Sequence, residues 1–129
     1  MGGKKAMGFW SRVRSRLTSS AAELEAQELS QDALEAGADP LGSVSDRALV
    51  DAVGVLRNIS IPPPGQVPSV IGELFDGTGS LSIVWLGRRE IPGIGCGVRL
   101  RVRGRVAMRR GQPVIYNPRY DILPAPGNH

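Results

Sequence analysis

The chain has 129 residues, an apolar content of 41% and a formal net charge of +4, which suits one folded domain with an extension. Its single cysteine, Cys96, excludes an intramolecular disulfide. With its only histidine at position 129, it offers neither a zinc site nor a thiol–imidazole pair. No apolar run suits a signal peptide or a membrane-spanning helix, so we expect a cytoplasmic protein without metal or cofactor.

Charge is unevenly distributed along the chain. Residues 1–20 carry five basic and no acidic side chains, and residues 21–51 carry eight acidic side chains and one arginine. Residues 52–129 carry ten arginines and four acidic side chains. Such segregation indicates a polyanionic partner for the basic parts and a solvated or self-shielding role for the acidic part.

A short basic helix is predicted within the first 20 residues. Trp10, Val13 and Leu17 share one helical face, beside Phe9, and the arginines lie mostly off that face. The helix could cap a β-barrel formed by the rest of the chain, contact nucleic acid or a partner protein, or bind a membrane surface. It is short and lacks a second anchor, so we expect no membrane partner.

A second, acidic helix is predicted from Ser20 to about Ala36. The sequence Ser20-Ala-Ala-Glu23 matches a capping box, and Gly37 is placed to end the helix. Its leucines give only a thin apolar face, so we expect it to lie at the periphery. Residues 39–42 indicate a linker, which ends an N-terminal extension over residues 1–42.

From residue 48 onward the apolar period changes to two, which predicts strands. Five are expected, over about residues 49–61, 69–75, 81–86, 98–107 and 114–122. Five strands with a longer connection after the third predict a mainly β protein, a five-stranded OB-fold Greek-key barrel over residues 43–123 with an N-terminal α-helical extension. An SH3-like barrel is the alternative. Residues 124–129 are expected to form a flexible tail.

The turn between the second and third strands is the strongest local signal. Asp76-Gly-Thr-Gly-Ser80 separates two apolar runs, and Asp-Gly in this setting predicts a β-hairpin. Both Gly77 and Gly79 are expected to supply positive φ. The glycine-rich connection over residues 87–97 has room for one helical turn.

Two motifs resemble a known module. Leu74-x-Asp76-Gly-Thr-Gly79-Ser-Leu-x-Ile-Val, followed by Gly97-x-Arg-Leu-x-Val-x-Gly104-x-Val, resembles the OB-fold nucleic-acid-binding module of class II aminoacyl-tRNA synthetase anticodon-binding domains and branch-migration helicase wedge domains. With the basic N-terminal helix and Tyr116-Asn-Pro-Arg-Tyr120, the chain resembles small stand-alone OB-fold proteins of high-GC Gram-positive bacteria. The resemblance covers residues 48–123 well and the first 40 loosely.

This resemblance implies that nucleic acid binds the outer face of the second and third strands. By position, the outward residues of these strands are Ile71, Glu73, Phe75, Ser82 and Val84. The residues expected to face the core are Leu81, Ile83 and Trp85. The stacking aromatic of the related synthetase domains corresponds to Ile71 here, and Glu73 adds a negative charge, so the face offers one aromatic ring, Phe75.

Five arginines are expected to border this face. They are Arg57 on the first strand, Arg88 and Arg89 after the third strand, and Arg109 and Arg110 in the turn between the fourth and fifth strands. A groove lined by these side chains would follow a nucleic-acid backbone, with an affinity that falls steeply in salt. Ordinary solvated surface charge is the alternative for each of them.

The predicted fourth strand carries a second basic feature. Four arginines alternate there with apolar residues, at positions 99, 101, 103 and 105. They could form a second phosphate track, pair with the acidic helix or protect an exposed strand edge. The aromatic rings nearby are assigned to the barrel, Trp85 to its core and Tyr116 and Tyr120 to half-buried closure positions.

No catalytic constellation is visible in the predicted barrel, which has no histidine and no phosphate-binding loop. The sequence therefore predicts a non-catalytic protein that binds single-stranded or structured DNA or RNA mainly through backbone phosphates. A protein–protein interaction module with no nucleic-acid contact is the alternative.

Overall fold

The computed structural model describes residues 20–124 of the chain. The helical residues 20–35 lead into a 3-10 turn, η1 (Leu41–Ser43), and then into six strands. The strands are β1 (Leu49–Ser60), β2 (Ser69–Phe75), β3 (Ser80–Leu86), β4 (Arg99–Arg109), β5 (Gln112–Tyr116) and β6 (Arg119–Leu123). The predicted basic helix with Phe9 and Trp10, and the predicted tail from residue 125, lie outside the described residues. No helix in residues 20–124 is long and apolar enough to cross a bilayer.

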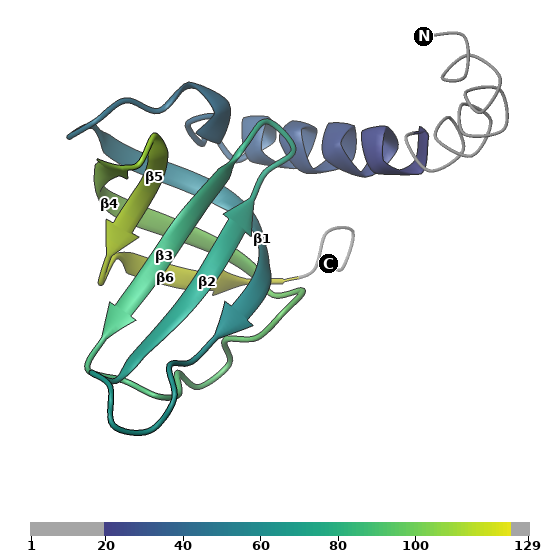
Figure 1. Cartoon of the computed structure of the whole chain (residues 1–129). Coiled ribbons are helices and arrows are strands. Elements are labelled where there is room, and N and C mark those ends of the chain that lie inside the picture. The colour runs from purple at the N-terminus through teal and green to yellow at the C-terminus, as the bar shows by residue number, and fades with distance from the viewer. Residues whose placement is uncertain (1–19, 125–129) are drawn as a thin grey trace, which may run out of the picture.

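The strands close into a barrel. They follow the order β1-β2-β3-β5-β4, and β4 pairs back with β1. The β3–β5 pairing is parallel and the others are antiparallel. This closed topology is that of the OB fold and excludes the SH3-like alternative, so the predicted fold class is confirmed. Figure 1 shows β2 and β3 across the front of the barrel, with β5 beside β3 and the helix at one end.

Alternation along the strands fills the barrel with aliphatic side chains. On β4, Leu100, Val102 and Val106 are buried while the arginines between them face outward, as the sequence predicts. Trp85 is also buried, as expected, and its ring packs edge-on against Tyr120, with ring centroids 5.8 Å apart. Trp85, the only tryptophan of the described residues, is therefore part of the core and is not on the outer surface of the barrel.

The prediction of one strand over about residues 114–122 is wrong, because the structure has two strands there, β5 and β6. Asn117 adopts a left-handed φ of 46°, and Pro118 follows it without an N–H to donate. The chain therefore turns at this corner, and β6 pairs with β4 instead of continuing β5. Asn117 itself bonds to β3. Its N–H donates to the Val84 carbonyl and its Oδ1 accepts from the Leu86 N–H, both at 2.8 Å.

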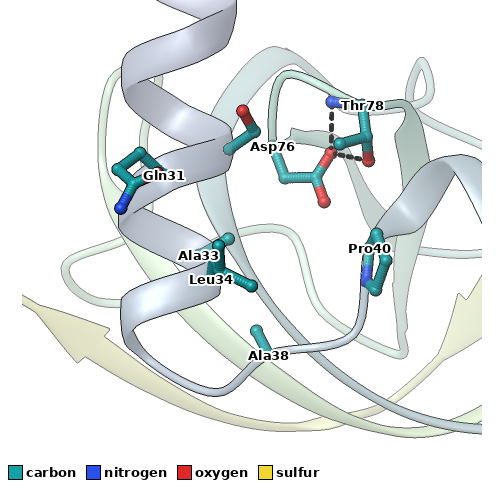
Figure 2. A pocket seen from close by; sticks show the side chains of 8 residues that line it. Gln31, Ala33, Leu34, Ala38, Pro40, Asp76 and Thr78 are labelled. Atoms are coloured by element: carbon teal, nitrogen blue, oxygen red, sulfur yellow. Dashed lines mark hydrogen bonds between the residues drawn. The ribbon is translucent and has the colours of Figure 1, made fainter.

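The hairpin is held by a buried carboxylate. Asp76 is 0% exposed, and its Oδ1 accepts hydrogen bonds from the Thr78 N–H, the Thr78 hydroxyl and the Gly79 N–H at 2.7–3.0 Å, partly visible in Figure 2. Its Oδ2 accepts a hydrogen bond from the Leu41 N–H at 2.9 Å. The predicted linker, residues 39–42, is thus docked on the barrel through Leu41 and Gly42.

The two glycines of the turn serve different purposes. Gly77 has the predicted positive φ, at 89°, whereas Gly79 does not, so that part of the prediction is wrong. A Cβ at Gly79 would lie 2.9 Å from the Gly42 nitrogen, so this position needs glycine for close approach of two backbones. The connection over residues 87–98 consists of turns and contains no helical turn.

We predict that Asp76→Asn lowers the free energy of unfolding by about 2–3 kcal/mol, because one amide oxygen cannot accept from both the turn and Leu41. Urea denaturation measures the change. Asp121→Asn is the control, since this carboxylate is exposed and accepts no hydrogen bond from residues 20–124. Equal unfolding midpoints and slopes for the two variants would contradict the role of Asp76.

Candidate nucleic-acid interface

The outer face of β2, β3 and β5 carries the predicted contact residues. Ile71 lies opposite Val84, and Val84 lies opposite Tyr116 on β5. In the next row, Glu73 lies opposite Ser82. The side chains of this face are half-buried or exposed, while Leu81 and Ile83 are fully buried in the core as predicted.

Two predicted residues, Arg57 and Phe75, are already engaged. The Arg57 guanidinium lies 4.1 Å from the centre of the Phe75 ring and forms an ion pair with Glu25 of the helix, with 2.5 Å between Nη2 and Oε1. A cation over an aromatic face is attracted to it. The edge of the face nearest β1 is therefore covered by contacts within the protein, and the one aromatic that the sequence assigned to this face is not free to stack on a base.

Glu73 holds a negative charge at the centre of the face. Its carboxylate accepts hydrogen bonds from the Asn58 amide at 3.1 Å and from the Ser80 hydroxyl at 2.9 Å. These bonds fix the carboxylate in place on the outer surface. Phosphates would be repelled there, whereas uncharged bases could lie against the apolar side chains of Ile71 and Val84.

Four predicted arginines lie at the two ends of the face. Arg88 and Arg89 follow the end of β3. Arg109 is the last residue of β4, not part of the turn as predicted, and Arg110 lies in the β4–β5 turn. Because β5 runs parallel to β3 from the level of Ser80, the two pairs are separated by the length of β3, roughly 20 Å. All four are exposed, and none forms an ion pair within residues 20–124.

Tyr116 was missed as a site residue. It was expected to be half-buried, but it is 43% exposed, whereas Tyr120 is half-buried against Trp85. The difference follows from the corner at Asn117, which ends β5 directly after Tyr116. The signal was present in the sequence, since Tyr116 follows the buried Ile115 and alternation places it outward.

Two of the β4 arginines, Arg99 and Arg101, form paired hydrogen bonds with different carboxylates. Arg99 forms two hydrogen bonds with Asp32 of the helix, at 2.7 and 2.8 Å. Arg101 forms two with Asp51 of β1, both at 2.8 Å. The expected pairing with the acidic helix is therefore correct for Arg99 and wrong for Arg101. The Arg101 hydrogen bonds hold the pKa of Asp51 below its ordinary value, and those bonds raise the pKa of Arg101.

In residues 20–124, no three histidine, cysteine or acidic side chains are grouped to hold a metal ion. A pocket of about 230 Å³ lies between the helix and the β2–β3 hairpin, and Asp76 lines it. Both Asp76 oxygens are occupied by hydrogen bonds within the protein, so this carboxylate acts as a structural group.

No protein-family model matches the sequence, and no relative was found among curated proteins. A chain in a solved replication protein A heterotrimer bound to ssDNA is similar, with 21% sequence identity and a TM-score of 0.48. The match covers 63% of this chain, and this chain spans 62% of the length of that one.

The lowered pKa of Asp51 predicts a specific pH dependence. The stabilisation that ionised Asp51 gives through Arg101 is fully present above the unfolded-state pKa of Asp51, about 3.9. It is lost as pH falls through the lower folded-state pKa of the same group. Asp51→Asn should therefore be less stable than wild type at about pH 5, with a difference that shrinks toward about pH 2. Urea unfolding across this range measures it, and a difference that does not change with pH would contradict the assignment.

Proposed function

We propose that this protein is a non-catalytic, cytoplasmic nucleic-acid-binding protein that contacts single-stranded or structured DNA or RNA mainly through backbone phosphates. The observation that carries the proposal is the outer face of β2, β3 and β5, with two exposed arginines at each end and Tyr116 between them. OB folds that bind oligonucleotides use this face.

The spacing of charges suits a single strand. The two arginine pairs lie roughly 20 Å apart, which a few nucleotides span, at the lower end of the roughly 4–16 nucleotides that an OB fold covers. Phosphates would sit on the arginines at each end. Glu73 keeps them away from the centre, where bases would lie on Ile71 and Val84 and stack on Tyr116.

Fluorescence anisotropy of labelled single-stranded DNA and RNA across a salt series tests the proposal. We expect log affinity to fall linearly with log salt. Arg88→Gln/Arg89→Gln should make that slope shallower by about 1.4, the loss of two phosphate contacts on a single strand. The matched control Ala22→Glu/Gln27→Glu lowers the net charge equally on exposed helix positions and should keep the wild-type slope. No binding at low salt would overturn the proposal.

Tyr116 gives a second prediction. Tyr116→Ala should weaken single-strand binding by about 1–3 kcal/mol, or roughly 5- to 150-fold, because base stacking on an aromatic ring contributes that much per base. Tyr116→Phe keeps the ring and should bind within about twofold of wild type. Equal binding by Tyr116→Ala and Tyr116→Phe would show that no base stacks there.

A protein-interaction module is the second candidate. Two leucines of the helix, Leu24 and Leu34, are 56% and 69% exposed, and Glu73 makes the centre of the barrel face acidic. Both features suit a protein surface with some basic character. Failure of every oligonucleotide to bind at low salt would favour this candidate.

A further inference from the structure

A groove adjoins the β2–β3–β5 face at Tyr116. It has a volume of about 420 Å³, within the range of about 300–1,000 Å³ typical of ligand sites. It lies over the start of β1, the outer side of β4 and the β5–β6 corner. Its lining residues, which we call the arginine groove, are Leu49, Arg103, Gly104, Arg105, Tyr116, Asn117, Pro118 and Arg119.

Positive charge in the arginine groove is poorly compensated. Arg103 reaches the Asp51 carboxylate only at 3.4 Å, because that carboxylate already accepts two shorter hydrogen bonds from Arg101. Arg105 donates one Nη1 hydrogen bond, to the backbone carbonyl of Arg47. Arg119 is exposed and forms no ion pair within residues 20–124.

The strand register adds repulsion within the groove. Arg103 on β4 lies directly opposite Arg119 on β6. Like charges at opposed positions of antiparallel strands destabilise a sheet. A phosphate bound between the two guanidinium groups would relieve the repulsion and accept hydrogen bonds from both.

Tyr116 connects the arginine groove to the proposed face. It lies opposite Val84 of that face and also lines the groove. On the other side, the β4–β5 pairing of Val106 with Ile115 brings Arg105 next to Tyr116. The exposed ring therefore stands at the corner where the two surfaces meet.

We propose that the arginine groove binds a second segment of the same single-stranded nucleic acid, which passes from the β2–β3–β5 face around Tyr116 and places phosphates on Arg103, Arg105 and Arg119. This inference rests on the proposed function. The proposed path favours a single strand over a duplex, because it bends around one side chain. A DNA duplex is too stiff for such a bend, since its persistence length is about 150 base pairs.

The test compares two double variants that each remove two charges. The groove variant is Arg103→Gln/Arg119→Gln, and the face variant is Arg88→Gln/Arg89→Gln. Fluorescence anisotropy measures their binding to labelled oligonucleotides of about 4 and about 12 nucleotides. For the long oligonucleotide, the groove variant should have a salt slope shallower by about 1.4 than wild type. For the short one, it should match wild type, whereas the face variant should lose slope with both. Thermal melting checks folding. Arg119→Gln alone should make the slope shallower by about 0.7, half the change expected for the double variant.

The outcomes separate the two proposals. Wild-type slopes for both groove variants, with a reduced slope for the face variant, would overturn the arginine groove and leave the proposed function standing. No binding by wild type would overturn both. Loss of poly-glutamate binding in the groove variants, with unchanged oligonucleotide binding, would overturn the inference and assign the groove to an acidic protein.

Discussion

The buried carboxylate of Asp76 joins the barrel to the segment that precedes it. One oxygen closes the β2–β3 turn, and the other accepts the Leu41 N–H, so a buried charge is satisfied only when both segments are in place. The same turn packs closely on the helix, because a Cβ at Gly77 would lie 2.0 Å from the Ala26 carbonyl oxygen. These contacts hold the helix and the segment after it against the β2–β3 turn.

Docking of the acidic segment determines which arginines remain available. Glu25, Asp32 and Asp51 each form an ion pair with an arginine of β1 or β4. Three of the eight acidic side chains of residues 21–51 are thus paired with arginines of the barrel strands. Within residues 20–124, exposed arginines without an ion pair remain at the two ends of the β2–β3–β5 face, and poorly compensated arginines remain in the arginine groove. The exposed ring of Tyr116 lies between them. A polyanion with stacking bases complements that arrangement.

Local patterns in the sequence were sufficient for the barrel, because period-two alternation and turn chemistry act over a few residues. The site depended on contacts between distant residues. Arg57 looked available from its strand, but its partner Glu25 lies 32 positions earlier in the chain. Alternation places Tyr116 outward, but it could not reveal that the corner at Asn117 and Pro118 ends the strand and that the next strand pairs with β4.

Mapping the backbone amide resonances of the full chain by NMR while titrating a single-stranded oligonucleotide tests the central claim most directly. The account predicts that the largest shifts fall on β2, β3, β5, residues 88–89 and the β4–β5 turn, with a second group at the β5–β6 corner. These shifts should fade as salt is raised. Shifts confined to residues 20–35, or none at low salt, would contradict it.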